Sequence, residues 1–222
     1  MDVDQYIASR LDGTFTCYKH IVIDGINYYF EKKENFDFFI KNKSSLWSKF
    51  ISQKMIDAFN ENCFSIYFVD EIEEDGEKVA DGCCIYKPCG DERLANTLVI
   101  MNHDNPSIIL HEFGHFIDFC MSPNSDQYFS EMTELKNIIL DEMNSFVKCF
   151  LVFYNMFGSL RHEVKINDIR TLALSVYYFD PREYFAENFA MFCMFPDYLK
   201  SKCPRTYSFI SKALGYTEVS NE

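Results

Sequence analysis

The pentapeptide His111-Glu-Phe-Gly-His115 constrains this chain more than any other segment. On a helix, residues four apart leave the same face one turn from each other, so both imidazoles would point to one side. Two imidazole nitrogens at this spacing can bind one zinc ion, each at about 2.0–2.1 Å. Glu112 lies beside them, where a carboxylate can take a proton from a water that the metal activates. The segment therefore predicts a zinc-binding helix with Glu112 as general base.

The residues around the pentapeptide also favour a helix. Asn105 is a typical N-cap and Pro106 a typical first helical residue. The apolar residues that follow at helical spacing are Ile109, Leu110, Phe113, Phe116, Ile117 and Cys120. They predict a largely buried helix, in which the alternative to a metal site is a pair of core histidines bonded to backbone carbonyls. That alternative leaves Glu112 as a third polar group in need of its own partner, whereas a metal site uses all three.

Composition limits the partners of this chain. Its 222 residues are typical of a single domain with a sizeable core, here residues 1–222. The formal net charge of −13 argues against nucleic acid as a partner and against docking to anionic membranes. No apolar run approaches the length of a membrane span, and the first residues lack a secretory signal. We therefore expect a cytoplasmic location, with delivery into another cell or compartment as the alternative; the oligomeric state is left open.

Nine cysteines are scattered through the chain, an odd number that indicates reduced thiols in a cytosolic compartment. Only Cys83, Cys84 and Cys89 form a cluster. A second metal site there is less favoured than a loop of idle or buried thiols, because no other pair of similar spacing completes it.

The hydrophobic spacing predicts an α+β fold. Two β-branched and aromatic runs around Asp24-Gly25 predict a β-hairpin at 18–30 with a type I′ turn. Further strands are expected at 64–69 and 97–101, loops at 70–81 and 82–93, and helices at 44–60, 129–156, 181–194 and 207–214. Together these elements predict a small mixed sheet with its hairpin packed on the zinc helix, followed by a mostly helical C-terminal half.

A catalytic zinc site needs a third protein ligand and an open position for water. Glu183 and Glu187 share one face of a predicted helix that is otherwise apolar. Two carboxylates so placed suggest one ligand and one residue that holds an imidazole. Asp180 and Glu183 also have the form of a capping box, which is the alternative role for Glu183. His162 and Glu163 are further candidates, but their polar neighbours favour a surface position.

Three segments of the chain resemble the catalytic domain of the anthrax lethal factor and the related bacterial Pro-Pro endopeptidases. They are HEFGHFID at 111–118, PREYFAENFA at 181–190 and LKSKCPRTYSF at 199–209. The third matches the Pro-Pro endopeptidases nearly residue for residue. The resemblance covers about residues 45–215, with a similar order of helix and strands before the first motif, and leaves 1–43 as an N-terminal hairpin region.

The resemblance implies a zincin-like fold and a zinc-dependent endopeptidase of the gluzincin type that holds one Zn²⁺. Carried over by position, it implies His111, His115 and Glu183 as zinc ligands and Glu112 as general base. It also implies a peptide or protein substrate with narrow selectivity, either a proline-rich segment or a host signalling protein.

Further residues take roles only through the resemblance. Glu187, and also Asp118, would support the ligands. The family has an oxyanion-stabilising tyrosine shortly before the glutamate ligand; its spacing is shifted here, so Tyr177 is our first choice and Tyr178 the second, and either can also be a core aromatic. The interval between the two motifs is longer than in the family, which implies a helical insertion at 129–165.

Two other functions fit the same residues. A zinc-stabilised module could bind a peptide without cutting it, although a module of that kind has no use for a base at Glu112. The chain could also be an effector that acts inside another cell, in which case a partner or secretion machine would deliver it.

Overall fold

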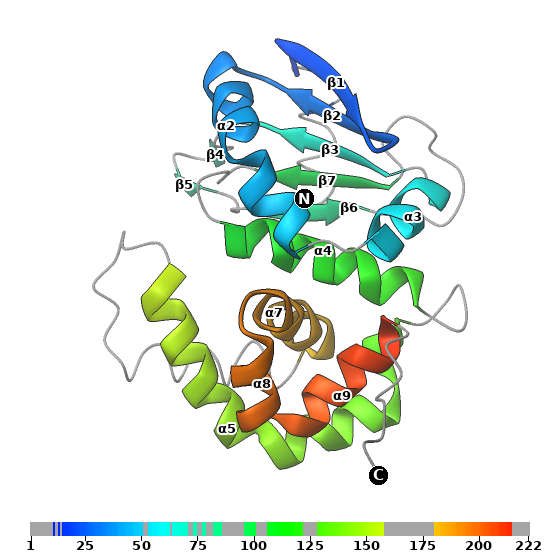
Figure 1. Cartoon of the computed structure of the whole chain (residues 1–222), viewed down its shortest axis with the longest axis vertical. Helices are drawn as coiled ribbons and strands as arrows, with labels where there is room; N and C mark the ends of the chain where they lie inside the picture. Colours follow the sequence, from blue (N-terminus) through cyan, green and yellow to red (C-terminus); the bar gives the residue numbers. More distant parts are fainter. Residues whose placement is uncertain are drawn as a thin grey trace. The chain divides into compact units, whose positions relative to one another are not determined.

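The computed structural model of this protein has an α+β fold, as predicted (Figure 1). It describes residues 11, 13, 15–50, 53–62, 64–70, 73–74, 77–78, 82–85, 96–100, 106–121, 128–157 and 180–214. Contacts divide the chain into two compact units, Met1–Phe113 and Gly114–Glu222. The division falls inside helix α4, Pro106–Cys120, which carries the pentapeptide.

The first unit is built on a five-stranded mixed sheet with the order β1-β2-β3-β7-β6 (Figure 1). The strands are β1 Lys19–Ile23, β2 Ile26–Phe30, β3 Ser65–Phe68, β6 Gly82–Ile85 and β7 Thr97–Ile100. Strands β2, β3 and β7 are parallel to one another, whereas β1 and β6 run antiparallel to their neighbours. The predicted mixed sheet is therefore confirmed.

The predicted hairpin is confirmed together with its turn. Strands β1 and β2 pair in antiparallel register, with Ile23 opposite Ile26. Between them Asp24 and Gly25 have φ angles of 53° and 84°. A type I′ turn needs positive φ at both central residues, and aspartate followed by glycine supplies it at low cost.

The helix predicted at 44–60 is wrong in its start. Helix α2 spans Lys33–Phe50 and therefore begins well before the serines expected to cap it, and a second helix, α3, spans Gln53–Glu61. The sequence of 33–43 is mostly polar, but Phe36 and Phe39 lie on one face and pack against Phe30 of β2, with ring centroids 5.3 Å apart in both pairs. Burial against the sheet decides where α2 begins.

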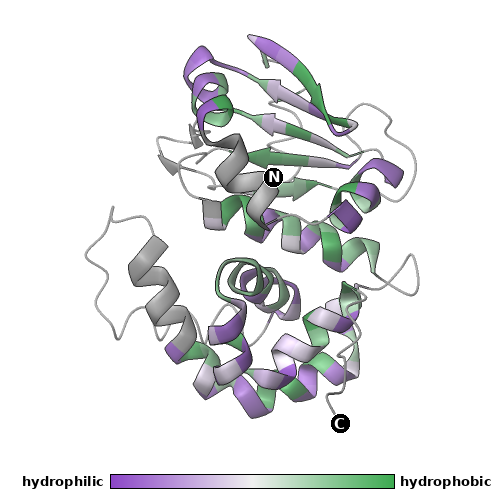
Figure 2. Ribbon diagram, in the orientation of Figure 1, coloured by the Kyte–Doolittle hydropathy of each residue, from purple (hydrophilic) through white to green (hydrophobic). Residues whose placement is uncertain are grey.

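Aromatic side chains fill the space between the sheet and its helices. Phe30, Phe39 and Phe68 are buried and lie 5.1 to 5.4 Å apart between ring centroids. Phe59 of α3 stacks on Phe113 of α4 at 5.1 Å. Figure 2 shows the polar faces of α2 and α3 in purple and hydrophobic colour along β7, which is buried at every position. These contacts fix the first half of α4 on the core of the first unit.

Two predicted loops contain strands. Within 82–93, Gly82–Ile85 forms strand β6, in which Cys83 and Ile85 are buried while Gly82 and Cys84 are half-buried. Within 70–81, β4 Glu73–Glu74 and β5 Glu77–Lys78 form a short antiparallel pair. Strand β6 begins with a glycine, a residue depleted in strands, and pairing with β7 overrides that low propensity.

The second unit contains helices only, among its described residues (Figure 1). They are the second half of α4, the 3₁₀ helix η1 Phe129–Glu131 and helices α5 Thr133–Phe157, α7 Pro181–Met194, α8 Pro196–Lys202 and α9 Pro204–Ala213. Helix α7 contacts η1, α5, α8 and α9, and it is buried from Tyr184 to Met191. The helix predicted at 181–194 and the mostly helical C-terminal half are thereby confirmed.

Helix boundaries in the second unit follow the prolines. Helices α7, α8 and α9 each begin with a proline at the first helical position, where no amide donor is lost. The final helix was predicted to begin at 207 but begins at Pro204, and α8 was not predicted. The region 129–156, expected to hold one or two helices, contains η1 and the single long helix α5.

In the part of the chain that the structure describes, no helix is both long enough and apolar enough to cross a lipid bilayer.

Candidate metal centre

Helix α4 presents His111 and His115 one turn apart, as their spacing predicts. The helix begins at Pro106, the expected first helical residue, while Asn105 lies outside the described residues. Both histidines are half-buried, whereas Ile109, Phe113 and Phe116 on the apolar side of the helix are buried. The core therefore fixes the helix, and the two imidazoles remain within reach of water.

Helix α7 supplies the third candidate ligand. The predicted cap at its start is confirmed: Asp180 precedes Pro181, and its carboxylate accepts a hydrogen bond from the Arg182 amide at 3.0 Å. Because this cap starts the helix at Pro181, Glu183 lies in its first turn. The Glu183 side chain keeps 35% of its surface exposed, in contrast to the buried residues that follow it.

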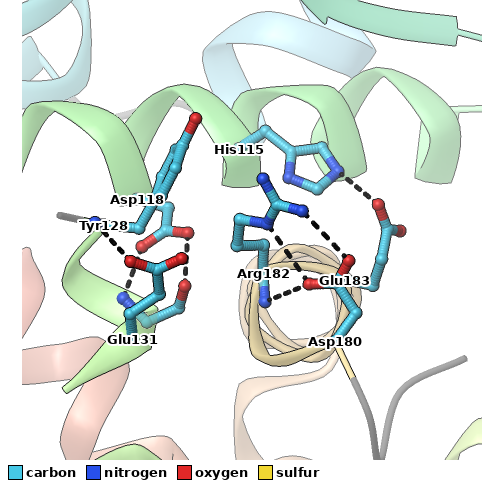
Figure 3. A network of polar contacts seen from close by, with 8 residues as sticks. His115, Asp118, Tyr128, Glu131, Asp180, Arg182 and Glu183 are labelled. Carbon is cyan, nitrogen blue, oxygen red and sulfur yellow. Dashed lines mark hydrogen bonds and ion pairs between the residues drawn. The ribbon is translucent and has the colours of Figure 1, made fainter. Parts of the chain in front are cut away.

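The three candidate ligands lie together. One ligand atom from each of His111, His115 and Glu183 lies within 4.8 Å of the other two. The Nε2 atom of His115 is 3.4 Å from Oε1 of Glu183, and Figure 3 shows these side chains pointing toward each other from α4 and α7. The residues selected from sequence as metal ligands are thus those that the fold brings together.

The donor set and the spacing fit a zinc ion. Two histidine nitrogens and one carboxylate oxygen are a usual set for a catalytic zinc, with a fourth position left for water or substrate. Atoms bound to one zinc at about 2.0–2.1 Å in tetrahedral geometry lie roughly 3.3–3.4 Å apart. The observed separation of His115 and Glu183 equals that value. All three side chains are half-buried.

Close packing of α7 against α4 brings Glu183 toward His115. A β-carbon built on Gly114 would lie 2.6 Å from the Cα atom of Ala186 and 3.0 Å from its carbonyl oxygen. Only glycine allows this approach, because the atoms met belong to the backbone of α7 and cannot turn aside. Gly114 adjoins His115 and Ala186 lies one turn after Glu183, so this contact sets the separation of the two ligands.

Asp118 anchors the second half of α4. It is fully buried, and its carboxylate accepts hydrogen bonds from the Ser130 amide and hydroxyl, both at 2.6 Å (Figure 3). Burial raises the pKa of Asp118 to about 6, while the hydrogen bonds from Ser130 and the charge of His115 oppose the rise. The carboxylate therefore joins α4 to η1 one turn after His115. The family resemblance implied a supporting role for Asp118, but no sequence pattern indicated Ser130 as its partner.

Glu112 and Glu187, the two other acidic residues predicted for the site, are both buried and lie on different helices. Glu112, the predicted general base, is buried, with 6% of its surface exposed, and lies on α4 between the two histidines in sequence. Glu187 is buried one turn after Glu183 on α7. This position is compatible with support of a ligand, and that role stays a prediction.

No sequence pattern indicated a role for Arg182 or Tyr128. The Arg182 guanidinium lies 5.2 Å from the centre of the Tyr128 ring and bonds the Asp180 carboxylate at 3.3 Å through two nitrogens (Figure 3). The hydrogen bonds and charge of Asp180 raise the pKa of Arg182. A fixed positive charge therefore adjoins Glu183. The sequence did not predict this charge near the site, because an arginine after a proline is not a recognisable pattern.

Several predicted residues lie outside the described residues. They are the oxyanion candidates Tyr177 and Tyr178, the rival ligands His162 and Glu163, and Cys89 of the cysteine cluster. Cys83 and Cys84 lie on β6, the first buried and the second half-buried, and neither forms a disulfide.

No protein-family model matches this chain, and no curated protein matches it.

Proposed function

We propose that this protein is a zinc-dependent endopeptidase with a zincin-like fold, of the type represented by the lethal factor catalytic domain and the Pro-Pro endopeptidases. The observation that carries the proposal is the convergence of His111, His115 and Glu183 within 4.8 Å. These three residues would hold the metal, and Glu112 adjoins His111 on the same helix.

The chemistry that zinc supplies in such a site is polarisation of a carbonyl oxygen and a lowered pKa, near ~7, for a water molecule. Glu112 takes the proton of the attacking water and later delivers it to the departing amine, as a general base and then a general acid. Because Glu112 is buried, its carboxylate is shielded from competing water. A tyrosine hydroxyl from Tyr177 or Tyr178 donates a hydrogen bond to the oxygen that becomes negatively charged.

The substrate is a peptide or protein segment that binds with narrow selectivity. A formal net charge of −13 favours encounters with basic segments over acidic ones, since long-range attraction raises their local concentration.

Cleavage of a diverse peptide library that includes Pro-Pro sequences, read by mass spectrometry, tests the proposal. Zinc content is measured beside it, and Glu112→Gln is the matched variant. We expect cuts by the wild type that fall by roughly 10²- to 10⁴-fold in Glu112→Gln while zinc is retained. A zinc-loaded protein that binds peptides without cutting them would instead be a binding module. A protein that retains no zinc would contradict the metal site itself.

A further inference from the structure

Strand β6 begins with Gly82, and the Glu112 side chain occupies the space that a side chain at position 82 would need. A β-carbon built on Gly82 would lie 2.8 Å from both Cγ and Oε1 of Glu112, and 3.1 Å from its Cδ. Real β-carbons essentially never approach another heavy atom closer than 3.0 Å. A side chain at 82 and the present position of the Glu112 carboxylate therefore exclude each other.

The backbone of Gly82 does not itself require glycine. Gly82 pairs with Ile100 in the ladder of β6 and β7, and among the described glycines only Gly25 has a positive φ. Glycine inside a strand weakens it and often marks a place where another group approaches closely. The group that approaches here is the Glu112 carboxylate.

We propose that Gly82 is a positioning residue for Glu112. A bare backbone at position 82 lets the carboxylate lie against β6, where Glu112 has only 6% of its surface exposed. The position of the general base is thus set by a strand far from the zinc helix in sequence. This inference rests on the proposed function, since that function makes Glu112 the base.

The contact predicts that Gly82→Ala slows catalysis without weakening the binding of substrate or zinc. The atoms that would clash are the far end of a flexible side chain, so the added methyl group moves the carboxylate and leaves the strand in place. Misplacing a catalytic group by about 1 Å can cost roughly 10²-fold in rate. We expect kcat to fall by about that factor, with KM and the zinc Kd unchanged within about twofold. Gly13→Ala is the matched control, because no atom lies within 4 Å of a β-carbon at Gly13.

A double-mutant cycle in thermal unfolding tests the contact without any activity. Gly82→Ala is compared in the wild-type and the Glu112→Ala backgrounds, with a chelator present. We expect Gly82→Ala to lower Tm by a few degrees in the first background and not to lower it in the second, where the space is vacated.

Three results would overturn the inference: a Gly82→Ala variant with wild-type kcat, a parallel loss of zinc affinity, or the same change of Tm in both backgrounds. If the wild type cleaves no peptide, the proposed function fails, and the cycle still decides whether Gly82 sets the position of Glu112.

Discussion

The Nε2 atom of His115 lies 3.4 Å from Oε1 of Glu183, and these residues come from helices in distant parts of the sequence. An imidazole and a carboxylate at this distance either form an ion pair or share a metal. The presence of His111 in the same cluster favours the metal, because all three donor atoms then have one partner.

Glu183→Gln is expected to weaken zinc binding by more than about 100-fold. Loss of a residue that only hydrogen-bonds a metal ligand typically costs about 10- to 100-fold in metal affinity, and loss of the ligand itself should cost more. The zinc Kd is measured by competition with a chromophoric chelator. Glu187→Gln should have a smaller effect. His162→Ala is the control for the rival ligand, and a larger loss of affinity in that variant would reassign the third position.

Gly114→Ala is expected to separate α4 from α7. The new methyl group meets the backbone of Ala186, so we expect a loss of roughly 1–3 kcal/mol in the free energy of unfolding, typical of overpacking. Zinc affinity should fall as well, because His115 and Glu183 move apart. Denaturant unfolding with a chelator and zinc competition measure the two effects. Unchanged values for both would contradict the role given to this contact.

The pH dependence of stability is expected to report on Asp118. Burial raises its pKa from 3.8 to about 6, so between these values the folded state binds more protons than the unfolded state. The free energy of unfolding therefore decreases as pH rises from 4 to 6, by at most roughly 3 kcal/mol from this group, and the contribution is constant above that range.

Two variants separate the charge of Asp118 from its hydrogen bonds. Asp118→Asn keeps an acceptor for the Ser130 amide and carries no charge, so the decrease between pH 4 and 6 should vanish. Ser130→Ala removes the hydroxyl donor that stabilises the carboxylate, so the pKa should rise further and the decrease should extend to higher pH. Urea unfolding of the metal-free proteins across this range measures both, and parallel pH profiles in all three proteins would exclude Asp118 as the source.

Glu142→Ala is expected to destabilise the second unit much more than Asp141→Ala. The buried Glu142 carboxylate accepts hydrogen bonds from the amides of Arg205 and Thr206, both at 2.9 Å, and from the Thr206 hydroxyl at 2.8 Å. Removing it leaves the first amides of α9 unpaired, at a cost of roughly 2–4 kcal/mol in the free energy of unfolding. Asp141 pairs with the Arg205 side chain in solvent, so its loss should cost less than about 1 kcal/mol. Equal losses in chemical denaturation would contradict this ranking.

Sequence patterns predicted the elements whose causes are local. The Asp24-Gly25 turn, the Pro106 helix start and the Asp180 cap depend on backbone preferences of one or two residues. Strand β6 was missed because it begins with a glycine, a residue depleted in strands, and because its partner β7 stabilises it. The start of α2 was missed because Phe36 and Phe39 are recognisable as a buried face only once the sheet beneath them is known.

By itself, the sequence determined that His111 and His115 leave one face of a helix with Glu112 between them, because helical periodicity fixes that geometry within a single segment. It also indicated Glu183 as a candidate metal ligand, with a capping role at the start of its helix as the alternative. Only the tertiary structure decided that Glu183 faces His115, that Ser130 holds Asp118, and that Gly82 makes room for Glu112. These relationships depend on how separate segments pack, and packing is set by the shapes of many side chains together, which no local pattern contains.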